Sequence, residues 1–298
     1  MRILSIVVTH NALQNNWIEK CLDSLKHSSQ KTDIFIIDNL SIDETTKYIE
    51  ENYPSIQLMK SDKNLGFGKA NNIGLKKAID ENYDYVFLLN QDAWVNDTTL
   101  EKLIEVSSQN PEFGIISPIH LNGKGDALDF NFSYYISPQY CRLFYSDVFL
   151  NKIKQIYPVN FINAAAWLIT KKCVEIVGGF SPTFYHYGED DNYCHRVLWH
   201  QLKIGVTSCC SIYHDRENRI EHSTIKEKWN KLVRSFVLYY SNPFSEKRIV
   251  GLYLTLLKTA VKKPVFLKYL PKTIINLAYK PIVQNKEISK IKRPFIDE

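Results

Sequence analysis

Residues 86–95 read Val86-Phe87-Leu88-Leu89-Asn90-Gln91-Asp92-Ala93-Trp94-Val95. The apolar run at the start has the length of one buried strand, and it stops abruptly at two amides and a carboxylate. In an open α/β sheet, ligands bind outside the carboxyl ends of the strands, so we expect Asn90 and Asp92 at the edge of a crevice. The Asp92 carboxylate suits a divalent ion that is shared with a substrate phosphate. An Asp that only ends a strand and starts a turn would give the same pattern.

Three more apolar runs of strand length precede this stretch, at residues 3–8, 34–37 and 56–59. A helical pattern follows each of them, and the last is reached through the glycine-rich segment 64–74. Such alternation of strands and helices favours an α/β fold with a mostly parallel sheet and helices on both faces.

Two further polar features lie at the ends of these predicted elements. Asp38 closes the second run and can accept a hydrogen bond from the ring N–H of a pyrimidine, or cap the following turn. The glycines of segment 64–74 allow a backbone to approach a diphosphate closely. This segment matches neither the GxGxxG fingerprint nor the GxxxxGK[ST] phosphate loop, so its spacing alone does not identify a nucleotide site.

The composition is that of a globular chain long enough for one large α/β domain with or without an appendage. It has 298 residues, of which 45% are hydrophobic and 23% are charged. The six cysteines lack zinc-ligand spacing, which favours free thiols in a reducing cytosol. The N-terminus lacks the pattern of an export signal, and no apolar run approaches the ~18 residues of a membrane span. We therefore expect a cytoplasmic protein.

Four polar motifs stand in order along the first hundred residues. They are Val8-Thr9-His10-Asn11, Ile37-Asp38-Asn39 with Ser41 and Asp43, Asn64-Leu65-Gly66-Phe67-Gly68 with Asn72 and Gly74, and Leu89-Asn90-Gln91-Asp92. This series resembles the nucleotide-binding half of family-2 glycosyltransferases, most closely their rhamnosyltransferase-like branch, which usually has Pro in place of Gln91.

The resemblance implies a glycosyltransferase A fold, with a mostly parallel, Rossmann-like sheet flanked by helices. It also implies that Asp38 reads the nucleotide base and that Asp92 holds a metal ion on the diphosphate of a nucleotide-sugar. The other residues that it places against the nucleotide-sugar are Thr9, Asn11, Asn64, Gly66, Asn72, Asn90 and Gln91.

A second signature begins at Gly178-Gly179-Phe180 and ends at Glu189-Asp190-Asp191-Asn192-Tyr193-Cys194-His195-Arg196. It resembles the G-G-F and E-D block of the same family. Inverting glycosyl transfer needs a base that takes the proton from the acceptor hydroxyl. The resemblance assigns this role to Asp190. From the residues alone, an acidic first helical turn favoured by the helix dipole is the alternative.

The remaining predicted site residues flank this base. Glu189, Asp191 and Trp167 are expected on the acceptor side, and Trp167 lies in a predicted strand, residues 159–169, whose small residues allow a ligand near the backbone. In the resembled family a His at the position of His214 completes the metal site. Asp92 and His214 are therefore the predicted ligands of Mg²⁺ or Mn²⁺.

We predict a catalytic domain at residues 1–220, with a nucleotide-binding half at about 1–117 and an acceptor-side half at about 118–220. A helical basic tail follows at 221–298. From residue 242 onwards there are 12 Lys or Arg and 4 Asp or Glu, a net charge of +8 against +5 for the whole chain. Apolar residues repeat at helical spacing in 249–261, which favours either peripheral contact with a membrane surface or packing on protein.

The predicted function is an inverting, metal-dependent transfer of a sugar from a nucleotide-sugar to a saccharide or a lipid-linked saccharide. The resemblance favours dTDP-rhamnose as donor, with UDP-sugars as the other possibility, and a role in bacterial surface-polysaccharide synthesis at the inner face of the plasma membrane. A sugar-nucleotidyltransferase and a non-catalytic sugar-nucleotide-binding protein are the alternatives. We expect no nucleic-acid partner, and a homo-oligomer is compatible with the sequence.

Overall fold

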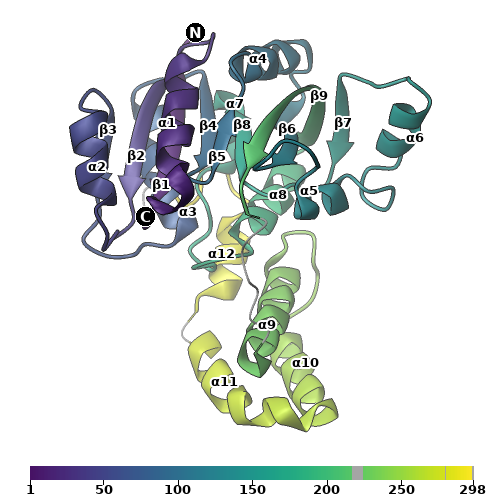
Figure 1. Cartoon of the computed structure of the whole chain (residues 1–298). Coiled ribbons are helices and arrows are strands. Elements are labelled where there is room, and N and C mark those ends of the chain that lie inside the picture. Colours follow the sequence, from purple (N-terminus) through teal and green to yellow (C-terminus); the bar gives the residue numbers. More distant parts are fainter. Residues whose placement is uncertain (217–223, 279, 297–298) are drawn as a thin grey trace.

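The computed structural model describes residues 1–216, 224–278 and 280–296 (Figure 1). In these residues nine strands form one sheet in the order β3-β2-β1-β4-β8-β6-β9-β5, with β7 paired to β9. The strands are β1 (Ile3–Thr9), β2 (Asp33–Asp38), β3 (Gln57–Lys60), β4 (Tyr85–Asn90), β5 (Ala93–Val95), β6 (Phe113–Asn122), β7 (Ile156–Val159), β8 (Ala166–Thr170) and β9 (Lys203–His214).

Helices connect the strands and then continue alone to the C-terminus. They are η1 (Gln14–Asn16), α1 (Trp17–His27), α2 (Thr45–Asn52), α3 (Phe67–Asp80), α4 (Thr99–Gln109), α5 (Phe130–Tyr135), α6 (Phe144–Phe149), α7 (Lys171–Val177), α8 (Glu189–Trp199), α9 (Ile225–Ser241), α10 (Ile249–Lys262), η2 (Pro264–Tyr269), α11 (Leu270–Ala278) and α12 (Ile282–Ile288). None of the described helices combines the length and the hydropathy that a bilayer span requires.

Two apolar clusters cover the two faces of the sheet, which confirms the predicted α/β class. One cluster joins α3, α7 and α8 to the sheet, and the other joins α1 and α4 to its opposite face. Strands β1 and β4 are buried along most of their length, which explains their nearly continuous apolar sequences.

The sheet is mixed, so the prediction of a mostly parallel sheet holds for its first half, whereas among the described strands of the second half only β6 and β9 pair in parallel. Strands β3, β2, β1 and β4 pair in parallel. Strand β8 then runs antiparallel to both of its neighbours, β4 and β6. The strand–helix alternation that led to the prediction comes from the first hundred residues, which form the parallel half. Antiparallel pairing needs no crossover helix, so the second half lacked that signal.

The predicted strand at residues 159–169 is also wrong in its extent. The chain instead forms β7 and β8 as separate strands, with residues 160–165 between them outside the sheet. Four of these six connecting residues are apolar and most are buried, so the segment resembles a strand in its hydropathy. Their position between the two strands brings them to the carboxyl ends of β1 and β4, as described below.

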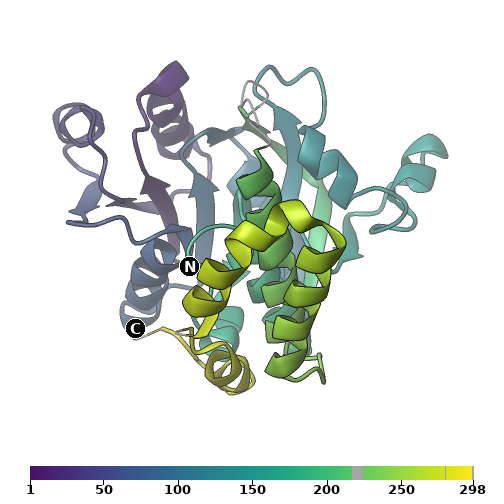
Figure 2. The same cartoon turned by 90° about the horizontal axis from the view of Figure 1, so that it is seen from below.

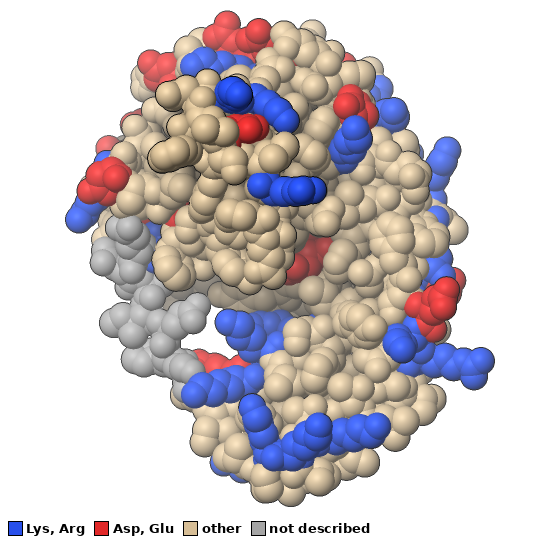
Figure 3. Space-filling model, turned by 90° about the vertical axis from the view of Figure 1, so that its right-hand side faces the viewer, with Lys and Arg blue, Asp and Glu red and all other residues tan. Residues whose placement is uncertain are grey.

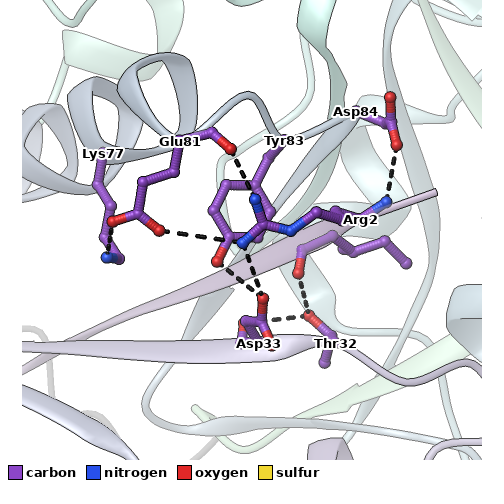
Figure 4. A network of polar contacts seen from close by, with 8 residues as sticks. Arg2, Thr32, Asp33, Lys77, Glu81, Tyr83 and Asp84 are labelled. Atoms are coloured by element: carbon purple, nitrogen blue, oxygen red, sulfur yellow. Dashed lines mark hydrogen bonds and ion pairs between the residues drawn. The ribbon is translucent and has the colours of Figure 1, made fainter.

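A polar network ties together the amino ends of β1, β2 and β4 (Figure 4). The Arg2 backbone N–H donates to the Asp84 carboxylate at 2.7 Å, and its guanidinium donates to the Glu81 carbonyl at 2.7 Å and lies 3.6 Å from Asp33. The Tyr83 hydroxyl donates to Asp33 at 2.8 Å, and the guanidinium lies 4.1 Å from the centroid of the Tyr83 ring.

The C-terminal helices lie beneath the sheet and form their own apolar cluster (Figure 2). Trp229 of α9, Leu252 and Leu256 of α10 and Phe266 of η2 are buried in this cluster, together with Phe184, which precedes α8. The described end of the chain then returns to the part of the molecule that contains the sheet, where Phe295 and Ile296 are buried. The predicted boundary at residue 220 lies outside the described residues.

Candidate active site

The carboxyl ends of β1 and β2 hold Asp38 in a fixed orientation. Thr9 donates its hydroxyl to Asp38 Oδ1 at 2.9 Å, and Ser41 donates its backbone N–H to Asp38 Oδ2 at 2.9 Å and its hydroxyl to Oδ1. Asp38 is only 2% exposed. These three hydrogen bonds fix the orientation of the carboxylate, and Oδ2 keeps acceptor capacity for a further donor.

Asn11 shapes the loop after β1. Its backbone has φ 50°, its N–H donates to the Ser41 hydroxyl at 2.9 Å, and its side chain accepts from the Ile42 N–H at 2.9 Å. Asn is among the few residues that adopt this left-handed conformation readily. The predicted donor-binding residue Asn11 thus joins the loops that follow β1 and β2.

Asn64 joins the two halves of the candidate site. Its side-chain oxygen accepts from the Asn39 amide at 3.1 Å, from the Gly66 N–H at 3.0 Å and from the Tyr185 hydroxyl at 3.0 Å. Tyr185 belongs to the second sequence signature, 121 residues away. The two motif regions that the sequence separates therefore meet in one network.

The side chain of Gln91, which follows β4, is hydrogen-bonded to the backbone of His10, which follows β1. Its side-chain oxygen accepts from the His10 N–H at 2.7 Å, and its side-chain amide donates to the His10 carbonyl at 3.1 Å. These two bonds hold the turn in which the resembled branch usually has Pro. The adjacent Asn90 donates its backbone N–H to the Ala165 carbonyl at 2.9 Å.

Asp92 and His214 approach each other at the carboxyl ends of β4 and β9. His214 Nε2 lies 3.6 Å from Asp92 Oδ1, and His214 Nδ1 lies 3.4 Å from Asp129 Oδ2. All three side chains are only about 1% exposed. The pairing of β5 with β9 brings Ala93 opposite His214, which fixes this approach. The structure thus forms a buried Asp–His–Asp series.

The neighbouring charges in this series shift the pKa values of His214 and Asp129 towards their ionised forms. Burial alone would lower the pKa of His214, but the nearby carboxylates of Asp129 and Asp92 outweigh it and raise that pKa. Burial alone would raise the pKa of Asp129, but His214 lowers it to about 2. His120 lies behind them, stacked on Phe132 with a centroid distance of 4.6 Å, and burial lowers its pKa to about 3.

These residues fit a divalent ion that is shared with a substrate. Asp92 Oδ1 and His214 Nε2 are two hard or borderline donors that face each other, and Asp129 occupies the other nitrogen of the same ring. A carboxylate on the second ring nitrogen is the arrangement that orients metal-bound histidines. Within the described residues no group of three or more His, Cys, Asp or Glu converges on one point. Two protein ligands plus phosphate oxygens complete such a shell.

The predicted base Asp190 lies in the first turn of α8. The preceding Gly188 has φ 92°, and the Asp191 N–H donates to Asp190 Oδ1 at 2.9 Å. Burial raises the pKa of Asp190, and backbone N–H groups, including that of Ala164, lower it in part. A carboxylate with a raised pKa is a better proton acceptor near neutral pH than an exposed one.

Glu189 and Asp191 surround this base with further negative charge. Burial, followed by the charge of Asp190, raises the pKa of Glu189 to about 7 and that of Asp191 to about 7. Glu189 is 4% exposed and its Oε2 has no hydrogen-bond partner among the described residues. Arg234 of α9 is the cation that lowers the pKa of Glu189. The C-terminal helices therefore reach the acidic cluster.

Residues 160–165 bridge the metal-binding side and the base. Ala165 accepts from the backbone N–H of Asn90, which precedes Asp92 by two residues, and the backbone N–H of the neighbouring Ala164 helps to lower the pKa of Asp190. The structure therefore brings the ends of β1, β2 and β4 and the start of α8 together at one edge of the sheet, as the sequence predicted.

Trp167 lies elsewhere, and its predicted place on the acceptor side is wrong. It is 0% exposed, lies opposite Leu88 in the sheet and stacks on Phe180 with ring centroids 6.3 Å apart. Both faces of the sheet are covered by helices at this point, so neither orientation of a side chain on β8 would reach solvent.

Asn72 and Gly66 have structural contacts that the sequence did not indicate. The Asn72 amide donates to the carbonyls of Phe180 and Phe295, and its oxygen accepts from the Phe180 N–H. Gly66 has φ 78°, and a Cβ there would lie 2.1 Å from the Tyr185 carbonyl oxygen. Both residues thus position the loop of the second signature, and a contact with the donor stays a prediction.

Asp129 is the site residue that the sequence reading missed. Its side chain accepts from the Phe132 N–H at 2.8 Å, as the N-cap of α5. In the sequence it stands in a stretch of turn residues, and only the parallel pairing of β6 with β9 brings it to His214. Asp three residues before a helical N–H is a capping pattern, which gives no sign of a second role.

A mixed sheet with flanking helices and a polar site at the carboxyl ends of β1, β2 and β4 has the glycosyltransferase A fold. The model of the family described as Glycosyl transferase family 2 matches residues 5–157, just over half of the chain. The chain therefore belongs to glycosyl transferase family 2.

Known proteins of this kind are similar to the chain at low identity. The low-salt glycan biosynthesis hexosyltransferase Agl10 of Haloferax volcanii is 24% identical over 197 residues, which are 63% of this chain and 61% of Agl10. S. aureus TarS residues 1–349 with UDP-GlcNAc has a TM-score of 0.57 at 15% identity, covering 97% of this chain and 79% of TarS. GalNAc-T7 with UDP, GalNAc and Mn²⁺ has a TM-score of 0.57 at 15% identity, covering 84% and 53%.

Proposed function

We propose that this protein is an inverting, metal-dependent glycosyltransferase that moves a sugar from a nucleotide-sugar to a saccharide or a lipid-linked saccharide. The observation that carries the proposal is the buried pair of Asp92 and His214, joined through residues 160–165 to the raised-pKa carboxylate of Asp190. Membership of glycosyl transferase family 2 supports it, as does the similarity to a hexosyltransferase of glycan biosynthesis.

The proposed reaction divides the work among these residues. Asp38 orients the nucleotide base, while Asp92 and His214 are the ligands that hold Mg²⁺ or Mn²⁺ against the diphosphate. When bound, the ion neutralises charge on the leaving diphosphate. Asp190 accepts the proton of the acceptor hydroxyl. At the same time the oxygen of that hydroxyl forms a bond to the anomeric carbon, and the bond from the anomeric carbon to the diphosphate breaks. Attack from the face opposite the leaving group inverts the anomeric centre.

The donor that we propose first is dTDP-rhamnose, because the motif series resembles the rhamnosyltransferase-like branch. UDP-sugars are the competing donors, because TarS was solved with UDP-GlcNAc and GalNAc-T7 with UDP. The proposed setting is the assembly of a bacterial surface polysaccharide.

A thermal-shift panel tests the donor. The purified protein is heated with dTDP-rhamnose, UDP-glucose, UDP-GlcNAc or GDP-mannose, each with Mn²⁺ and with excess chelator. A ligand at 100 times its dissociation constant should stabilise the protein by ~2.7 kcal/mol. We expect one nucleotide base to stabilise the protein only with Mn²⁺. The absence of a shift with every donor would contradict the proposal.

A second assay distinguishes the alternatives. With the stabilising donor and no acceptor, a glycosyltransferase slowly hydrolyses the donor and releases a nucleoside diphosphate. A sugar-nucleotidyltransferase would instead release pyrophosphate from a nucleoside triphosphate and a sugar 1-phosphate. A non-catalytic binding protein would show the thermal shift and neither product.

A further inference from the structure

Helix α10 is apolar on two faces. Leu252, Leu256 and Ala260 point into the cluster of the C-terminal helices and are fully buried. A second stripe, consisting of Val250, Leu254, Leu257 and Val261, repeats at the i, i+4, i+7 and i+11 spacing of one helical face and is between 47% and 61% exposed. A helix that is apolar all round is normally buried. The outer stripe of α10 therefore lacks the cover that its composition requires.

Exposed apolar side chains also occur in η2 and α11, the two elements that follow α10 and pack against it. Val265 and Leu267 of η2 and Ile275 of α11 are between 44% and 57% exposed. Contiguous exposed apolar surface on a monomer marks an interaction site rather than ordinary surface. We call the outer face of α10, η2 and α11 the distal face.

The charge of the distal face has one sign. Residues 249–278 contain five lysines and no Asp or Glu, and Lys258 and Lys262 flank the apolar stripe of α10. Figure 3 shows Lys and Arg side chains, in blue, spread over the lower part of the molecule with few acidic side chains among them. Lysine stems lie along apolar surface while their ammonium groups stay in water.

The segment that follows the distal face contacts the part of the molecule that contains the sheet. Asn285 of α12 donates to the Thr183 hydroxyl at 2.8 Å, and Lys280 donates to the Thr183 carbonyl at 3.1 Å. At the described end of the chain, Pro294 accepts from the Gly179 N–H at 2.8 Å and Phe295 accepts from Asn72 at 3.1 Å. Both contacts involve the loop that carries the second signature.

We infer that the distal face binds the surface of an anionic phospholipid bilayer. An apolar helical face flanked by lysines is the composition of helices that lie in the plane of a membrane interface. A second copy of the chain fits less well, because an isologous contact would bring the five lysines against the same five in the partner. The anionic bilayer matches both the apolar stripe and the positive charge. This inference stands independently of the proposed reaction.

Vesicle sedimentation at low salt tests the inference with the full chain. The probes are vesicles of pure phosphatidylcholine and vesicles containing phosphatidylglycerol. We expect binding to the second kind only, and weaker binding at 500 mM salt because screening shortens the range of the lysine charges. Equal binding to both kinds, or no binding to either, would overturn the inference.

Two matched pairs of variants sharpen the test. Lys258→Gln with Lys262→Gln should weaken binding about 30-fold, whereas Lys152→Gln with Lys172→Gln removes the same charge from the catalytic part and should leave binding unchanged. Leu254→Ser with Leu257→Ser should weaken binding at least about tenfold. The control is Phe149→Ser with Leu150→Ser, which should leave binding unchanged. Phe149 and Leu150 lie at the end of α6 and are 86% and 57% exposed.

Each variant is checked by circular dichroism and by its mass in solution. If both distal-face variants bind vesicles like their controls, the inference is wrong. It is equally wrong if the wild type is a dimer that the leucine substitutions convert to a monomer. Truncation of the tail is a poorer test, because it would also remove the buried residues Phe295 and Ile296 from the catalytic part.

Discussion

The two ends of the parallel strands treat charge in opposite ways. At the amino ends, Arg2 pairs with acidic groups on an exposed surface (Figure 4). At the carboxyl ends, Asp92 is buried beside a single histidine, and Glu189, Asp190 and Asp191 lie next to one another. Burying like charges together costs stability, whereas exposed pairs contribute little of either sign. The unfavourable burial of charge at the carboxyl ends is best explained by a functional role of those carboxylates. The exposed ion pairs at the amino ends need no explanation beyond linking β1, β2 and β4.

The largest expected effect is that of Asp92→Asn. The substitution keeps the size of the side chain and removes the negative charge that would hold a divalent ion. We expect donor turnover to be abolished while circular dichroism shows an intact fold. Asp33→Asn, at the amino end, is the matched control and should retain wild-type turnover. Full activity of the wild type in excess chelator would contradict the metal role.

Asp190→Asn is expected to have the next largest effect. It removes basicity at the proposed proton acceptor, so turnover should fall by ~10²–10⁴ while donor affinity stays within a few-fold. Steady-state kinetics and a separate donor-binding titration measure the two quantities. Asp33→Asn, at the amino end of β2, again serves as the control and should retain wild-type turnover. A collapse of donor binding in Asp190→Asn would assign Asp190 to the donor site and return the role of base to Glu189 or Asp191.

The pH dependence of the free energy of unfolding, compared between Glu189→Gln and the wild type, tests how much stability the buried acidic residues cost. The folded-state pKa of Glu189, about 7, is above its model-peptide value of about 4.3, so the folded protein binds a proton that the unfolded chain releases. The free energy of unfolding should therefore fall as pH rises from about 4.5 to 7 and then level off. Urea denaturation should show Glu189→Gln gaining roughly 1–3 kcal/mol relative to wild type between pH 5 and pH 8. An unchanged difference at the two pH values would refute this account.

Arg2→Ala should have the smallest effect. Its pairs are exposed, and such pairs are worth ~0.2–1 kcal/mol each at most. We expect a small loss in the urea midpoint and no change in turnover. A large loss of turnover would mean that the amino end also serves the reaction and would remove the contrast between the two ends.

The sequence predicted the parallel half of the fold because a strand that is buried on both faces has a continuous apolar sequence. Strands β1, β2 and β4 read as short apolar runs that end in polar residues, and those polar residues are the candidate site. The second half lacked this mark. Residues 160–165 are mostly apolar and buried like a strand, yet they form a connection outside the sheet that accepts a hydrogen bond from Asn90.

Individual residues show the same limit at the site. Asp190 and Asp92 were predicted because they belong to motifs with a chemical reason for a carboxylate, and their roles stay predictions. Asp129 was missed because its local role as an N-cap hides its contact with His214, which depends on strand pairing between distant segments. Trp167 was misplaced because β8 is buried on both faces. Its sequence therefore lacks the alternation of apolar and polar residues that would indicate which side chains face a ligand.

Calorimetric titration of UDP and dTDP tests most directly whether the carboxyl end binds a nucleotide through a metal ion. The titrations use the wild type, Asp92→Asn and Asp33→Asn, each with Mn²⁺ and with excess chelator. We predict that the wild type and Asp33→Asn bind one of the two nucleotides in the presence of Mn²⁺ and lose most of that affinity in chelator, while Asp92→Asn binds weakly in both conditions. Metal-independent binding that is equal in all three proteins would contradict the account.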